Sequence, residues 1–280
     1  MPRPLIITLK EGVDPVYGLR RAMAPVTPVT VENGTLTPGN YRYVLMSEKS
    51  TYARGVHAMQ KACEKETSSL HPLFIIDNGS QIYRPLTFKE VIQARVTDYN
   101  TLQDEDGNER DLEDRLRFFN HWIDSCTGMA YKAGTTKFKV IPLCRELITI
   151  KKSFNDAFLP VQYDNIVGVE LDTGKGEYDR SLTKKEVVNH KAWLAAVEDD
   201  KSLLKEYRDI VFAQLKTRYN LDTGMGFYFA DVGEEDDELR ALLVDNLSGS
   251  SSAFGSDSLL SGGSFLLVAP SGAPQATRKK

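Results

Sequence analysis

Apolar residues recur at the spacing of an α-helix in several stretches of the chain. In the stretch 52–65, Val56 and Met59 fall on one face, which is typical of an amphipathic helix that packs against a core. Two further helices are expected to begin at capping boxes, because a threonine is followed three residues later by a glutamate at residues 87–90 and 183–186. The predicted helices cover residues 52–65, 87–99, 111–126, 187–197, 202–220 and 236–247.

Short runs of β-branched and aromatic residues lie between these helices and predict strands. Two of the runs fold back at Asn33-Gly34 and Asn78-Gly79, the dipeptide that a type I′ hairpin turn prefers. No unit repeats, so the sequence predicts an α+β fold: mixed short strands and amphipathic helices in one compact body, with a helical hairpin in the C-terminal half. The predicted strands cover residues 5–9, 29–37, 41–46, 73–77, 81–84, 138–141, 147–150, 166–171 and 227–229.

The composition changes after residue 246. Serine and glycine make up 12 of the 18 residues from 247 to 264, which is typical of a low-complexity linker. Apolar clusters interrupt this stretch, and the sequence ends on Arg278-Lys279-Lys280. A linker that only separates two domains does not need such apolar and basic groups. The sequence therefore predicts a globular body over residues 1–246, with a sub-boundary near 180, and a tail over 247–280 that docks on a partner or a neighbouring copy. The predicted docking residues are Phe254, Leu259, Leu260, Phe265 and Leu266.

Charge is spread unevenly, although the net value is only −4. Residues 161–246 carry 19 acidic and 11 basic groups, whereas residues 129–152 carry six basic groups and one acidic group. In the basic stretch, lysines alternate with Phe138; lysines neutralise phosphates and aromatic rings stack on unpaired bases, which predicts contact with single-stranded nucleic acid. The alternative is that Phe138 belongs to the core and the lysines to a solvated face, because strand neighbours point to opposite sides. The predicted nucleic-acid-binding residues are Lys132, Lys137, Lys139, Arg145, Lys151 and Lys152.

Residues suited to catalysis or metal binding are scattered along the chain. The four histidines and three cysteines match no metal-ligand spacing, and Cys126 is better read as a packed thiol than as a nucleophile activated by His121. The acidic run 104–109 fails the register of a calcium loop, because placing Gly107 sixth puts Leu102 first. Glycine-rich phosphate loops and a Gly-x-Ser-x-Gly elbow are also missing, so the sequence predicts no metal and no cofactor.

Three classes of function remain open. The first is a non-enzymatic binding protein that contacts nucleic acid and recruits partners through its tail. The second is a self-assembling structural protein whose tail docks on neighbouring subunits, and the third is an enzyme whose site joins residues distant in sequence. Because the sequence contains no catalytic motif, we expect a binding or assembly role rather than an enzymatic one. No run reaches the ~18 apolar residues of a membrane span, and the N-terminus lacks the apolar stretch of a signal peptide, which predicts a cytoplasmic protein without a membrane partner.

Overall fold

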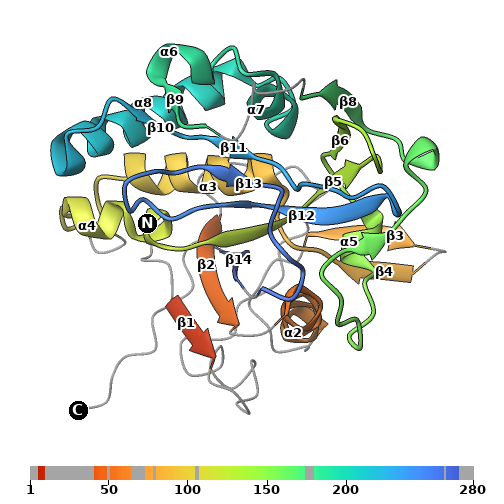
Figure 1. The fold of residues 1–280 in the computed structure, drawn as a ribbon. Coiled ribbons are helices and arrows are strands. Elements are labelled where there is room, and N and C mark those ends of the chain that lie inside the picture. Colours follow the sequence, from red (N-terminus) through yellow and green to blue (C-terminus); the bar gives the residue numbers. More distant parts are fainter. Residues whose placement is uncertain are drawn as a thin grey trace.

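Figure 1 shows the computed structural model, which describes residues 6–9, 41–48, 51–64, 73–77, 80–104, 107–173, 180–261 and 263–270. Helices and strands mix in one compact body, which confirms the predicted α+β fold. Across these ranges, the chain forms no helix with the length and apolar character needed to cross a bilayer. The predicted hairpin at residues 29–37 and the turn at Asn78-Gly79 lie outside the described residues.

A mixed sheet runs through the middle of the molecule. Within the described ranges ten strands pair into it, and its main path follows the order β1, β2, β14, β5, β12, β13, β11. The central strand β5 pairs antiparallel with β12, while β6 and β8 branch from β5 and β7 pairs with β12. Its strands are β1 (Ile6–Leu9), β2 (Tyr41–Glu48), β5 (Ile123–Tyr131), β6 (Lys137–Ile141), β7 (Leu159–Pro160), β8 (Val169–Asp172), β11 (Phe227–Tyr228), β12 (Glu238–Val244), β13 (Ala253–Phe254) and β14 (Ser264–Pro270).

Helices and two small ribbons surround the sheet (Figure 1). The ribbons are β3 (Phe74–Asp77) with β4 (Ser80–Tyr83), and β9 (Leu182–Thr183) with β10 (Thr223–Gly224). The helices are α2 (Tyr52–Glu64), α3 (Phe88–Asn100), α4 (Leu112–Arg115), η2 (Arg117–Asn120), α5 (Arg145–Ile148), η3 (Tyr163–Asn165), α6 (Lys184–Val187), α7 (Lys191–Ala196) and α8 (Lys201–Tyr219).

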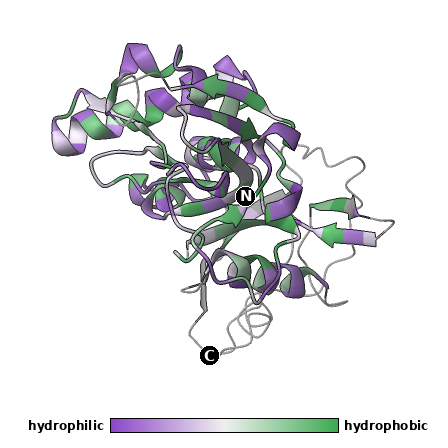
Figure 2. Cartoon of the chain, turned by 45° about the vertical axis from the view of Figure 1, so that its right-hand side comes forward, coloured by the Kyte–Doolittle hydropathy of each residue, from purple (hydrophilic) through white to green (hydrophobic). Residues whose placement is uncertain are grey.

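Two apolar cores form, one on each face of the sheet. The first joins α3, α7 and α8 to inward residues such as Ile123 and Phe227, and the second joins α2 and α5 to residues such as Ala130 and Leu239. Neighbouring strand residues point to opposite faces, so β5 serves both cores and all of its residues are buried. Figure 2 shows that the helices around the sheet carry both hydrophobic and hydrophilic residues, as amphipathic elements should.

Three of the helices predicted from periodicity and capping are present as long helices. α2, α3 and α8 occupy the predicted stretches to within a residue or two. At the start of α3, the Thr87 hydroxyl accepts from the backbone N–H of Glu90 (3.3 Å), and the Glu90 carboxylate accepts from the N–H of Thr87 (2.7 Å). This reciprocal pair satisfies two N–H groups that the first turn leaves without intrahelical acceptors. The second box, at residues 183–186, begins the short helix α6.

Three predicted elements adopt a different structure. Residues 111–126 form only two short helical turns, α4 and η2, before they enter β5. Residues 236–247 contribute β12 instead of a helix, and the stretch 147–150 falls at the end of α5 instead of in a strand. β5 and β12 lie side by side with both faces covered, so their apolar residues need not alternate. A continuous apolar run of this kind cannot be told from a helical stripe by periodicity.

The C-terminal segment belongs to the body at least as far as Pro270. β14 pairs antiparallel with β2 over seven residues, and its Ser264 pairs with Ile123 of β5. Phe265 and Leu267 enter the core beside α2, whereas Leu266 and Val268 enter the opposite core. Residues 271–280, with the basic end of the chain, lie outside the described residues, and the sub-boundary near 180 stays a prediction.

Most of the predicted docking residues serve the core of this chain. Leu259, Phe265 and Leu266 are buried, and Phe254 is half-buried. Leu260 is the exception, because 44% of it is exposed. The apolar clusters of this Ser/Gly-rich stretch thus belong to strand β14 and to the segment that precedes it. Residues 247–270 do not form the expected separate docking arm.

The serines of this segment are structural. The Arg95 guanidinium, fully buried in α3, donates to the hydroxyls of Tyr207 (2.8 Å) and Ser251 (3.1 Å) and to the carbonyl oxygens of His121 and Asp245. A buried charge costs several kcal/mol unless such partners compensate it. The serine-rich stretch therefore supplies hydrogen-bond acceptors to a buried polar network that joins α3 and α8.

Candidate functional site

Two of the predicted nucleic-acid-binding lysines are paired with carboxylates. Lys132 lies 2.8 Å from the carboxylate of Asp164, and Lys137 lies 3.6 Å from that of Glu170. The bond from Lys132 lowers the pKa of Asp164, as expected when a cation favours the charged form. Each pair cancels charge that a phosphate would otherwise meet, although such exposed pairs are weak and salt-sensitive.

Lys139 and Phe138 are both engaged in contacts within the protein. The Lys139 ammonium donates to the carbonyl oxygens of Tyr163 (3.0 Å) and Ile166 (2.9 Å) and lies over the Tyr163 ring. Phe138 is fully buried, with the Phe229 ring 4.6 Å away. The alternative in which Phe138 belongs to the core is therefore confirmed, and it cannot stack on a base.

The other predicted basic residues lie elsewhere on the surface. Arg145, at the start of α5, pairs with Asp77 of β3. Lys151 and Lys152 are exposed on the turn after α5. The structure does not gather the six residues into one charged groove, and nucleic-acid contact stays a prediction.

The cysteines are packed thiols. Burial raises the pKa of Cys63 and of Cys126 to about 12, and it raises the pKa of Cys144 well above its usual value. A thiol with so high a pKa is hardly ionised at neutral pH, which makes it a poor nucleophile and metal ligand. Over the described part of the chain, no three His, Cys, Asp or Glu side chains come together as a metal site.

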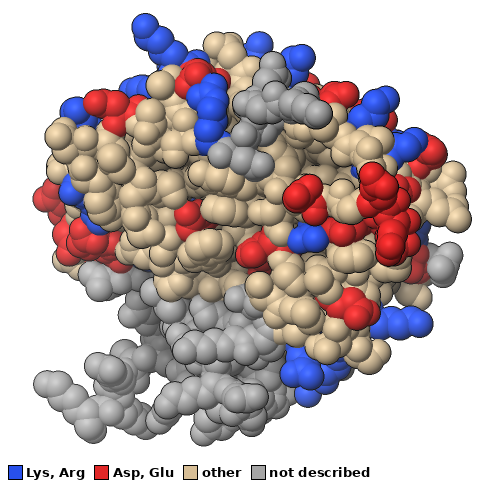
Figure 3. All heavy atoms as spheres, viewed as in Figure 1, with Lys and Arg blue, Asp and Glu red and all other residues tan. Residues whose placement is uncertain are grey.

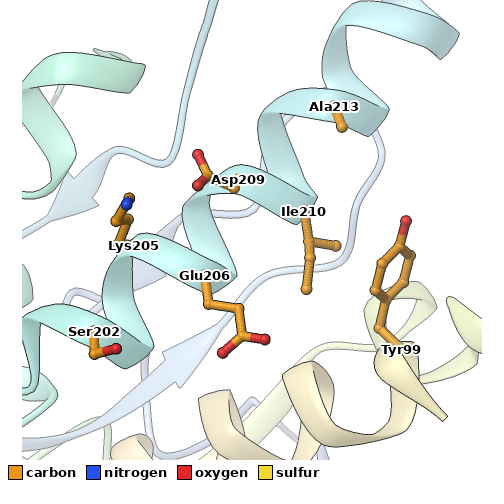
Figure 4. A pocket seen from close by; sticks show the side chains of 7 residues that line it. All are labelled: Tyr99, Ser202, Lys205, Glu206, Asp209, Ile210 and Ala213. Atoms are coloured by element: carbon orange, nitrogen blue, oxygen red, sulfur yellow. The ribbon is translucent and has the colours of Figure 1, made fainter.

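A pocket of about 450 Å³ lies between the C-terminal end of α3 and the surface of α8 (Figure 4). Its charged groups already have protein partners: the Glu206 carboxylate accepts from Asn100 (2.6 Å), and Asp209 pairs with Lys184 (2.8 Å). Most of the lining is exposed, with Ile210 as a buried floor. The lining residues are Tyr99, Ser202, Lys205, Glu206, Asp209, Ile210 and Ala213.

Three aromatic rings form a stack on the face of the sheet that also carries α2. Tyr228 of β11 lies opposite Phe254 of β13, and their ring centroids are 4.7 Å apart with planes at 17°. Trp122, just before β5, follows at 5.4 Å from the Phe254 ring. We call these three residues the aromatic column. Side chains on neighbouring strands stand close enough to stack in this way.

The aromatic column has a closed end and an open end. At the closed end, Gly226 packs so near the Tyr228 ring that a Cβ on it would stand 2.7 Å from that ring. At the open end, Trp122 is 41% exposed, whereas the other tryptophan, Trp193, is fully buried. Sequence reasoning missed the column, because Trp122 lies more than a hundred residues before Tyr228 and Phe254.

The column also offers free polar groups. The indole N–H of Trp193 donates to the carbonyl of Met225 (2.9 Å). By contrast, among the described residues neither the indole N–H of Trp122 nor the hydroxyl of Tyr228 has a hydrogen-bond partner. Buried aromatics of these types normally find one; Trp122 is exposed without a partner, so its N–H group can serve a ligand, whereas Tyr228 is half-buried.

Acidic groups dominate the charged surroundings. In Figure 3, Asp and Glu gather at the right of the view, over the connection between β11 and β12, while the middle over β11 and β13 shows few charged atoms. The exposed acids of this connection are Asp231, Glu234, Glu235 and Asp236. The neighbouring Asp237 is structural, because its carboxylate accepts the N–H groups of Ala133 (2.8 Å) and Tyr163 (2.9 Å). The first residues of the predicted helix 236–247 thus belong to a loop that leads into β12.

No protein-family model matches the chain, and no curated protein matches it. A solved structure described as "Accommodation of massive sequence variation in Nanoarchaeota by the C-type lectin fold" is similar, with a TM-score of 0.50 and 12% sequence identity. The match covers 83% of this chain and 99% of the other. At this identity the likeness concerns the fold alone.

Proposed function

We propose that the protein is a non-enzymatic binding protein that holds an uncharged sugar ring against the open end of the aromatic column. The observation that carries the proposal is Trp122, which presents a solvent-exposed ring and an unengaged N–H group at the end of a stack fixed by Phe254. Ligand sites combine apolar and aromatic walls with a few polar groups that fix orientation.

The charges near the column favour an uncharged ligand over a polyanion. Asp257 follows Phe254 closely along the chain, and the nearby cation of Arg240 is engaged by the Glu238 carboxylate (2.6 Å) and the Ser256 carbonyl (2.6 Å). A phosphate group would meet carboxylates here without a free cation, which costs free energy. A sugar offers C–H groups for the exposed ring face of Trp122 and hydroxyls for its indole N–H group.

The fold also supports a binding role. The similar structure is described as a C-type lectin fold that accommodates massive sequence variation in Nanoarchaeota. A scaffold that tolerates change can present different side chains on a constant core, which suits recognition.

The test begins with a glycan array probed with the labelled full chain, followed by calorimetry on the best uncharged oligosaccharide. Replacing Trp122 with alanine should weaken binding about 30-fold, because truncating a central tryptophan typically costs about 2 kcal/mol. Phe74→Ala is the matched control, since Phe74 is also 41% exposed but lies on β3. Equal losses in both variants, or none in Trp122→Ala, would refute the proposal.

A labelled single-stranded oligonucleotide is the competing probe. If it binds and the glycans do not, and Lys151→Glu with Lys152→Glu abolishes that binding, the nucleic-acid prediction replaces the sugar proposal. The salt dependence of affinity gives a second readout, because phosphate contacts release counterions and sugar contacts do not.

A further inference from the structure

Asp124 of β5 is a buried carboxyl group with an unpaired oxygen. Only 4% of the residue is exposed, and its Oδ2 meets no hydrogen-bond donor among the described residues. Gly263 packs against it so closely that a Cβ on this glycine would stand 2.4 Å from Oδ2. Burying a carboxylate without full hydrogen bonding is costly, so this place favours the uncharged acid.

A second carboxyl group, Asp257, faces Asp124 from the segment that follows β13. Burial and the charge of Asp257 raise the pKa of Asp124 to about 7, while the N–H of Gly263 opposes the shift. Burial also raises the pKa of Asp257, and the N–H of Ser258 and the cation of Arg240 on β12 lower it. The two acids therefore disfavour being charged together.

The remaining titratable neighbours add no positive charge. Tyr52 of α2 is fully buried, its hydroxyl donates to the Ser125 carbonyl (2.9 Å), and burial raises its pKa well above the usual value. Cys126, two residues along β5, is also kept protonated by burial. Without a facing cation, ionised Asp124 has no compensating partner on α2 or β5.

The segment that carries Asp257 crosses the α2 side of the sheet. We call residues 255–261 the strap. At its middle, the N–H of Leu259 donates to the Ala157 carbonyl (2.8 Å), and the Leu259 carbonyl accepts from the N–H of Tyr52 (3.0 Å). These bonds fasten one part of the strap to α2, while Leu260, beyond them, is exposed.

The residues that flank the strap on both sides belong to the aromatic column or are bonded to it. Phe254 immediately precedes it, and after Gly263 the N–H of Ser264 donates to the Trp122 carbonyl (3.0 Å). The strap thus connects Phe254 with the segment that is hydrogen-bonded to Trp122.

We propose that Asp124 is uncharged while the strap lies closed on the sheet, and that its ionisation loosens the strap and with it the aromatic column. The effect on a ligand rests on the proposed function, but the opening of the strap does not. On opening, Asp124 reaches water and releases its proton to solvent. Acidity thus closes the strap and alkaline conditions favour its opening.

The test is amide hydrogen exchange of the full chain without ligand, read for a peptide that spans residues 255–264. After correction for the intrinsic rate, its protection factor should fall about tenfold per pH unit from about pH 4.5 to pH 7 and then level off, because opening releases one proton in that window. In Asp124→Asn, which cannot ionise at this position, the protection factor should lose most of its pH dependence, and what is left comes from Asp257, whose pKa burial also raises. Peptides from α8 report global unfolding and should keep higher protection throughout.

Two further variants and three outcomes decide between the proposal and its alternatives. Asp257→Asn should move the levelling to a lower pH, which provides a second variant if Asp124→Asn does not fold. Asp231→Asn, an exposed carboxylate in another loop, should keep the wild-type profile. A flat wild-type profile, a wild-type profile in Asp124→Asn, or a parallel fall in the α8 peptides would each overturn the proposal. Because no ligand is present, these results stand whether or not a sugar binds.

Discussion

Asp124→Asn should stabilise the protein at alkaline pH and destabilise it at acidic pH, where only the cost of the unsatisfied amide remains. The carboxyl group has a pKa of about 7 in the folded chain, against an ordinary value of 3.8, chiefly because of burial and then because of Asp257. The folded state therefore holds this proton where the unfolded state has lost it. Stability falls as pH rises from about 4 to about 7 and is constant above, since both states are then ionised.

The size of the effect follows from the same two values. At about 1.36 kcal/mol per pH unit, the step from 3.8 to about 7 corresponds to a loss of about 4 kcal/mol in the free energy of unfolding. Asparagine removes this loss, but its amide N–H groups need acceptors, and leaving one unsatisfied costs about 1–3 kcal/mol. A net gain of about 1–3 kcal/mol at pH 8 is the expected result.

Urea unfolding of both proteins between pH 4.5 and pH 8.5 measures this difference directly. Carboxyl groups other than the coupled Asp257 titrate equally in the two proteins, so the subtraction isolates the contribution of Asp124 together with its coupling to Asp257. The gain from asparagine should grow by about 1.4 kcal/mol per pH unit below pH 7 and then stop growing. A difference that is the same at pH 5 and pH 8 would refute the reasoning, because it would mean that Asp124 ionises at its ordinary pKa.

Further predictions concern the core and the thiols. Ending the chain after residue 246 should abolish cooperative thermal unfolding, because it removes β14 from the sheet, whereas ending it after residue 270 should preserve the transition. Arg95→Ala should lower the free energy of unfolding by about 3–5 kcal/mol in urea titrations, since it leaves buried carbonyl and hydroxyl groups without a donor; a loss below 1 kcal/mol would contradict the network. Alkylation of Cys126 by iodoacetamide in the native protein should be at least about tenfold slower than that of free cysteine, because burial raises its pKa to about 12; mass spectrometry measures this rate.

Periodicity predicted the elements whose one face is buried and whose other face meets water. α2, α3 and α8 are of this kind, and the capping box at Thr87 also fixed where α3 begins. β12 and the first residues of β5 were predicted as helix because both faces of these strands are covered, and the covering segments are distant in sequence. The alternation of Lys137, Phe138 and Lys139 did reveal a strand with one buried side.

Composition misled the interpretation of residues 247–270. Serine and glycine suit a flexible linker, but Ser251 and Ser252 are fully buried and Gly263 is required by close contact with Asp124. What identifies them as structural is the donor or carboxyl group that each one contacts: Arg95 of α3, the N–H of Gly226 just before β11, and Asp124 of β5. The aromatic column was hidden for the same reason, since pairing between β11 and β13 and the position of Trp122 create it.

Tryptophan fluorescence tests the binding proposal most directly. The chain has two tryptophans, of which Trp193 is fully buried and Trp122 is 41% exposed. Titration with the uncharged oligosaccharide selected on the array should change the emission and protect Trp122 from quenching by acrylamide, and Trp122→Phe should remove both effects. Saturable binding by calorimetry without any change in the emission or quenching of Trp122 would contradict the account.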